Sequence, residues 1–131
     1  MSYYLSKELA LTFEEAIPAV IDALSQEGFG ILTDIDVKAT LKTKLGVEFR
    51  KYRILGACNP PFAHHALELE RRIGLMLPCN VIVQELGERK VEVAAIDPLA
   101  SMQAVGNPAL SEVGAEIRTK LARVIDSLGA G

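Results

Sequence analysis

The chain has 131 residues, half of them hydrophobic and a quarter charged, which suits one globular core and not a disordered protein. A formal charge of −3 and the absence of tryptophan argue against a nucleic-acid partner, which needs a basic face and stacking aromatic rings. No apolar run approaches the roughly 18 residues of a membrane span, and the first residues lack the apolar core of a signal peptide. We therefore expect one cytoplasmic domain over residues 1–131, without a membrane segment.

The apolar pattern predicts strands and helices in a mixed order. Strands are expected at residues 3–9, 29–35, 51–58, 80–86 and 90–97, the last two joined as a hairpin. Helices are expected to follow Thr12, Asp36, Asn59 and Pro108, because apolar residues recur at helical spacing after each. The order strand–helix–strand–helix–strand–helix–strand–strand–helix predicts an α+β fold, with a largely antiparallel sheet of about five strands and helices mainly on one face.

Local signals support the helix boundaries. Thr12 and Glu15 have the spacing of a capping box, and Asp36 and Asn59 are side chains that commonly cap helix starts. Glycines at 28 and 46 fit the ends of the first two helices. The second of these helices carries Val37, Leu41 and Leu45 on one face.

The two cysteines stand in short strings rich in proline and asparagine. Cys58 precedes Asn59 and Pro60 where the third strand is expected to end, and Cys79 follows Pro78 at the start of the hairpin. Element ends are where proteins concentrate binding residues, so these strings predict a site. A helix start after Cys58 favours its thiolate, whereas the alternative is that both thiols are small buried apolar groups.

We expect no bound metal and no cofactor. The cysteines are too far apart in sequence for a zinc pair, no glycine-rich phosphate loop is present, and no paired histidine motif accompanies them. His64 has Glu68 four residues on, which indicates a surface ion pair, although His64 with Cys58 would also supply a nucleophile and a base. Asp97 before Pro98 is interpreted as shaping a turn. Whether the protein is an enzyme is left open.

Three strings in order, YRILGACNP at residues 52–60, LPCNV at 77–81 and AIDP at 95–98, resemble a prokaryotic family called "domain of unknown function 302". The resemblance covers essentially the whole chain and carries over no catalytic assignment. It implies a TATA-binding-protein-like fold, in which a curved antiparallel sheet is backed by helices and its open face is available for binding. It also implies a homodimer.

The leading hypothesis is a non-catalytic domain that binds a small ligand or a protein near the two cysteine strings, where Asn59 and a helix start would receive polar or anionic groups. A second hypothesis is a thiol enzyme or redox sensor that uses Cys58 with Cys79. A third is a purely structural homodimeric module with an interface on the open sheet face. The candidate ligand-binding residues are Gly56, Cys58, Asn59, Pro60, His64, Pro78, Cys79 and Asp97.

Overall fold

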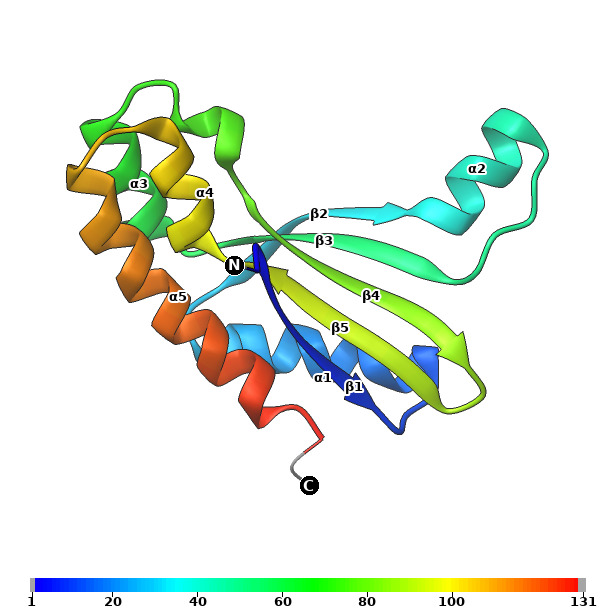
Figure 1. The fold of residues 1–131 in the computed structure, drawn as a ribbon. Coiled ribbons are helices and arrows are strands. Elements are labelled where there is room, and N and C mark those ends of the chain that lie inside the picture. The colour runs from blue at the N-terminus through cyan, green and yellow to red at the C-terminus, as the bar shows by residue number, and fades with distance from the viewer. Residues whose placement is uncertain (1, 130–131) are drawn as a thin grey trace.

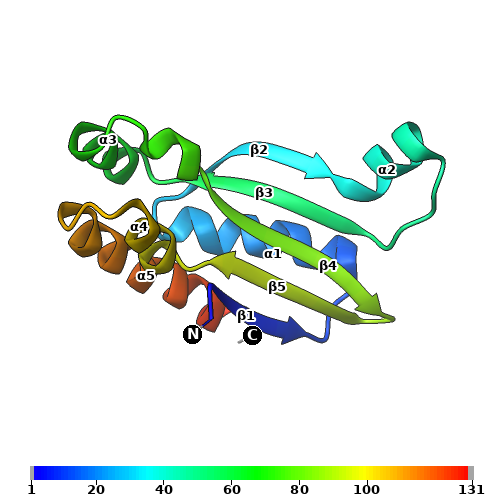
Figure 2. The ribbon, with the colours of Figure 1, turned by 45° about the horizontal axis from the view of Figure 1, so that its top comes forward.

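The computed structural model, which describes residues 2–129, contains a five-stranded sheet with helices packed on one of its faces (Figures 1 and 2). The strands are β1 (Tyr4–Leu9), β2 (Gly30–Asp36), β3 (Tyr52–Cys58), β4 (Cys79–Gly87) and β5 (Lys90–Ile96). The helices are α1 (Phe13–Gln26), α2 (Val37–Leu45), α3 (Pro60–Leu69), α4 (Pro98–Val105) and α5 (Ala109–Ser127). The predicted α+β class is confirmed, and the predicted elements occur in the predicted order.

The strands lie in the order β1-β5-β4-β3-β2, and every neighbouring pair is antiparallel. The β4–β5 hairpin therefore occupies the centre, and the two strands from the N-terminal part of the chain form the edges. Because side chains alternate across a strand, β4 presents Val81 and Val83 to the buried face and Ile82 and Gln84 to the other.

Helices α1 and α5 cover the buried face and close the core. The capping box predicted at the start of α1 is confirmed, since the Glu15 amide donates to the Thr12 hydroxyl and the Thr12 amide donates to Glu15. Val20 and Leu24 of α1 and Leu121 of α5 are fully buried against the central strands. No described helix of residues 2–129 combines the length and the apolar character that crossing a membrane would require.

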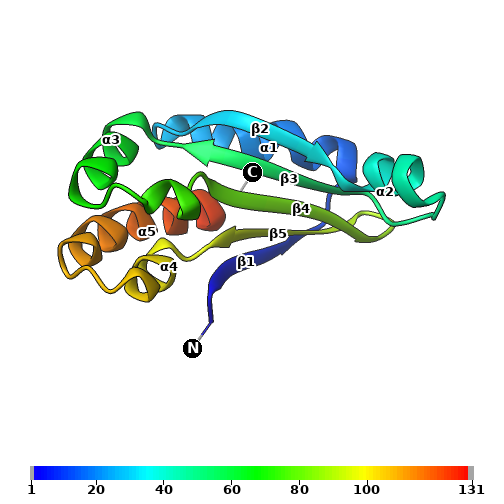
Figure 3. The same ribbon diagram turned by 90° about the horizontal axis from the view of Figure 1, so that it is seen from above.

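Helix α2 projects beyond the ends of β2 and β3, away from the other helices (Figures 1 and 3). Its predicted cap at Asp36 and its left-handed end at Gly46 are both present. None of its residues is buried, however, and Leu45 is 69% exposed. The predicted helix is therefore present. Its apolar face is not buried, because the helix lies beyond the ends of the strands, where no second layer of the described chain packs against it.

Helix α4 is an element that the sequence reasoning missed. Asp97 does not merely shape a turn: its carboxylate Oδ1 accepts from the Leu99 and Ala100 amides and so caps α4. Pro98 fits the first helical position, where an amide hydrogen has no partner, and the helix ends at left-handed Gly106. The same signal of an acidic or amide side chain before proline was recognised at Asn59.

Candidate functional site

An apolar pocket of about 340 Å³ opens where β3 ends and β4 begins, under α3 and the 3₁₀ turn at Ile73–Met76. Aliphatic and aromatic side chains form most of its wall, and the wall contains no charged residue. The lining residues are Phe29, Leu32, Ala57, Cys58, Asn59, Phe62, Ala63, Leu67, Gly74, Leu77, Pro78 and Cys79. We call this cavity the cysteine pocket.

The structure brings both cysteines to this pocket from neighbouring strands. Cys58 is the last residue of β3 and Cys79 is the first of β4, and Ala57 lies directly opposite Cys79 in the ladder. Cys79 is buried, and burial together with the neighbouring Cys58 thiol raises the pKa of Cys79 to about 11. The Cys79 sulfur is therefore a protonated, apolar part of the wall near neutral pH.

The closeness of β3 to the segment before β4 depends on Gly56. A side-chain carbon at this position would lie 2.1 Å from Thr33 Oγ1 and 2.7 Å from Pro78 Cγ, so only glycine leaves room for both neighbours. The Pro78 ring consequently packs over β3 and forms one wall of the pocket. Gly56 itself is buried and does not line the cavity.

Asn59 lines the pocket, but its side chain is already engaged. Oδ1 accepts from the Phe62 amide at 3.3 Å and Nδ2 donates to the Glu27 carbonyl at 3.4 Å. The first two residues of α3, Pro60 and Pro61, have no amide hydrogen to offer. The start of α3 therefore presents no free donors to the anionic group that the sequence led us to expect there.

The remaining candidates lie outside the cavity. Pro60 is exposed at the start of α3. His64 does not line the pocket; its side chain is 77% exposed, and its Nε2 lies 3.8 Å from Glu68 Oε1. Asp97 is at the same end of the sheet, but its Oδ2 accepts from Arg118 Nε at 2.9 Å and its Oδ1 caps α4. The structure thus gathers Cys58, Asn59, Pro78 and Cys79 and separates them from His64 and Asp97.

Sequence reasoning missed the apolar walls of the pocket. Leu32 stands at an irregularity in the β2–β3 register, and although it lines the pocket it is 66% exposed. The sequence reasoning did not place Ala63 of α3 at a site, although Ala63 lines the pocket. Helix α3 and residues 73–78 contain more apolar residues than one buried helix stripe needs. This excess is the signal in the sequence from which the pocket wall could have been predicted.

Within residues 2–129, no group of three or more histidine, cysteine, aspartate or glutamate side chains is arranged to hold a metal ion.

The comparisons with known proteins identify a family and a fold. The family described as "Domain of unknown function DUF302" matches residues 5–128. A crystal structure of an uncharacterized conserved DUF302 protein from Bacillus stearothermophilus is similar, with 28% identity and a TM-score of 0.89, over 96% of this chain and 98% of that one. None of the curated proteins matches this chain.

Proposed function

This chain belongs to the DUF302 family, a domain of unknown function, and we propose that it binds a small, largely apolar molecule in the cysteine pocket. The observation that carries the proposal is an open cavity of about 340 Å³ whose wall is almost wholly apolar. A hollow of this size falls in the range of small-molecule sites, about 300–1,000 Å³.

The chemistry of the wall sets the class of ligand. Apolar surface exposed to water is costly, and a ligand that covers it releases that cost roughly in proportion to the area buried. A charged group would lose its hydration without gaining a partner, because the wall is uncharged and the amides at the start of α3 are engaged or absent. A neutral aliphatic or aromatic molecule is therefore favoured over an anion.

Binding of aminoanthracene, whose fluorescence rises in apolar surroundings and whose aryl amine is uncharged near neutral pH, tests the proposal. Ala63→Phe places a ring in the cavity from a half-buried position of α3, whereas His64→Phe adds a ring of the same size on the outer face of that helix. We expect saturable binding to the wild type and to His64→Phe, and at least about tenfold weaker binding to Ala63→Phe, a loss of about 1.4 kcal/mol. Equal binding to the two variants, or no saturable binding to the wild type, would show that the pocket is not a ligand site.

The thiol hypothesis remains a prediction of its own. In its favour, both sulfurs line one cavity. Against it, the raised pKa of Cys79, about 11, keeps the proposed resolving thiol protonated, and thiolate is the form that attacks. Alkylation rates measured against pH separate the two roles: a fast plateau near neutral pH would support a reactive Cys58, and complete protection in the native state would exclude it.

The homodimer, the likeness to TATA-binding protein and the cytoplasmic location also stay predictions. Sedimentation velocity over a range of protein concentrations measures whether the chain self-associates. A constant monomer mass at every protein concentration would refute the homodimer prediction.

A further inference from the structure

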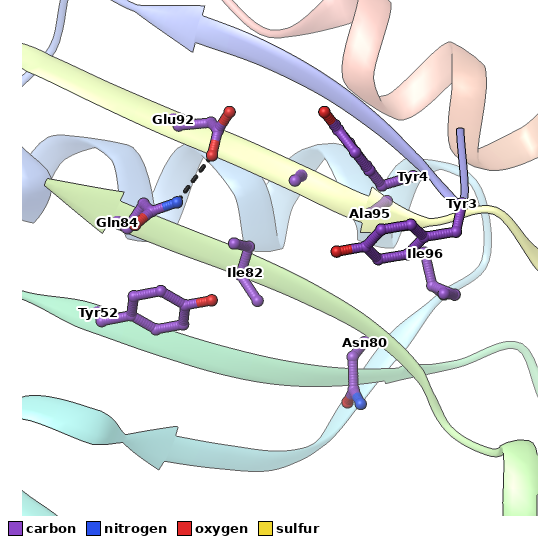
Figure 4. A pocket seen from close by; sticks show the side chains of 10 residues that line it. Tyr3, Tyr4, Tyr52, Asn80, Ile82, Gln84, Glu92, Ala95 and Ile96 are labelled. Carbon is purple, nitrogen blue, oxygen red and sulfur yellow. Dashed lines mark hydrogen bonds between the residues drawn. The ribbon is translucent and has the colours of Figure 1, made fainter. Parts of the chain in front are cut away.

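The helix-free face of the sheet carries a second hollow, a trough of about 420 Å³ across β1, β5, β4 and β3 (Figure 4). Its floor is apolar, with Ile82 and Ala94 paired across the two central strands. None of the residues lining this trough lines the cysteine pocket, so the two cavities are separate sites. The trough is lined by Tyr3, Tyr4, Tyr52, Asn80, Ile82, Gln84, Glu92, Ala94, Ala95 and Ile96.

Aromatic rings border the trough on two sides. Tyr3 and Tyr4 form a corner, with ring centroids 5.1 Å apart and planes inclined at 73°. Tyr52 stands on the opposite side, and its hydroxyl and that of Tyr3 point toward one another over the floor (Figure 4). Aromatic faces carry partial negative charge, so walls of this kind attract cations.

A carboxylate is fixed at the rim of the trough. Gln84 Nε2 donates to Glu92 Oε1 at 2.7 Å, and Gln84 Oε1 accepts from Arg50 Nε at 2.8 Å. The glutamine amide is thereby held at both ends and orients the Glu92 side chain, whose other oxygen has no hydrogen-bond partner among residues 2–129. Glu92 is the one charged residue among those lining the trough.

The neighbouring charges keep this carboxylate accessible to a cation. Glu8 lies directly opposite Glu92 in the β1–β5 ladder, so the nearest cross-strand side chain is a second carboxylate. Lys90 Nζ lies 3.9 Å from Glu8 Oε2. Arg50 does not line the trough, and its guanidinium lies 4.4 Å from the Phe49 ring centroid and 5.7 Å from that of Tyr52. Neither cation forms an ion pair with Glu92 in the described chain.

We propose that this trough binds an organic ammonium ion with an apolar body. The body lies on Ile82 and Ala94 between the tyrosine rings, and the ammonium group donates to the free oxygen of Glu92. An oriented carboxylate gives a charge-assisted hydrogen bond, and the aromatic walls add cation–π attraction, whereas an anion of the same shape meets repulsion from Glu92 and Glu8.

The test compares phenethylamine, which is protonated near neutral pH, with phenethyl alcohol, its uncharged counterpart, by NMR titration of the full chain. We expect the amine to shift the Ile82 and Ala94 signals and to bind about tenfold more tightly than the alcohol. Glu92→Gln keeps the size of the side chain and should bring the two ligands within about twofold of each other. Glu88→Gln removes a carboxylate from the exposed hairpin end and should leave the preference unchanged.

Tyr4→Leu is a second variant, which leaves Glu92 and its partners in place. It should weaken binding of the amine by about threefold, and it should weaken binding of the alcohol less. Equal affinities of the two ligands for the wild type, a preserved preference in Glu92→Gln, or the same loss in Glu88→Gln would overturn the proposal. So would the absence of shifts at Ile82 and Ala94 at millimolar ligand. None of these outcomes bears on aminoanthracene in the cysteine pocket, so the two proposals fail independently.

Discussion

Replacing Asp97 with alanine should lower the free energy of unfolding by about 2 kcal/mol, without weakening a ligand in the cysteine pocket. The largest loss is the cap of α4, because Oδ1 accepts from the Leu99 amide at 3.0 Å and from the Ala100 amide at 3.5 Å. A lost cap costs about 1 kcal/mol, and up to about 2 where the site is well ordered. The pair with Arg118 adds only about 0.5 kcal/mol, because the Arg118 side chain is 43% exposed and water screens the charge.

Asp97→Asn separates these two contributions. Asparagine caps helices about as well as aspartate, so this variant should lose only the ion pair and cost about 0.5 kcal/mol, as should Arg118→Ala. Urea denaturation followed by circular dichroism measures all three variants. Equal losses in Asp97→Ala and Asp97→Asn would refute the capping argument, and a loss of aminoanthracene binding with unchanged stability would make Asp97 a ligand residue instead.

Two further predictions concern Cys79, which lines the cysteine pocket, and Gly56, which leaves room for the Pro78 ring beside it. Because the pKa of Cys79 is about 11 when folded and about 8.5 when unfolded, the unfolded chain releases its proton first as pH rises. The stability from this group is thus complete below about pH 8.5 and falls by up to about 3 kcal/mol by pH 11. Denaturation of wild type and Cys79→Ala at each pH should show this difference in slope, and parallel curves would contradict it. Gly56→Ala should cost about 2 kcal/mol or more, since its new methyl meets Thr33 and Pro78; a melting temperature equal to the wild type would show that both neighbours move aside.

Much of the fold follows from local sequence, because a helix cap is a contact within four residues. Thr12, Asp36 and Asn59 were identified as caps for that reason, and the structure confirms each of them. Asp97 was misread although it has the same form as Asn59, since the residues after it lack the clear apolar stripe that marked α3. The exposure of α2 could not be predicted either, because an apolar stripe on a helix does not show whether another element packs against it.

The two cavities differ in how far the sequence could predict them. The cysteine strings indicated the correct end of the sheet. The wall residue Leu32, however, comes from β2 and lines the same cavity as α3 only because of the tertiary fold. The trough was not predictable, because Tyr4 and Glu92 line one cavity only when β1 pairs with β5, and no local pattern sets that strand pairing. The residues of the three strings at 52–60, 77–81 and 95–98 accordingly divide into two kinds: Gly56 allows close packing and Asp97 caps a helix, whereas Cys58 and Cys79 line a cavity.

The most direct test of ligand binding in the cysteine pocket is an isotope-filtered nuclear Overhauser experiment on the full chain with bound aminoanthracene. The account predicts contacts from the probe to the side chains of Phe62, Ala63 and Leu77, which face the cavity from α3 and from the segment before β4. Contacts confined to the exposed Leu75 side chain or to Tyr52 on the open face would contradict it, because the probe would then lie on the surface or in the trough.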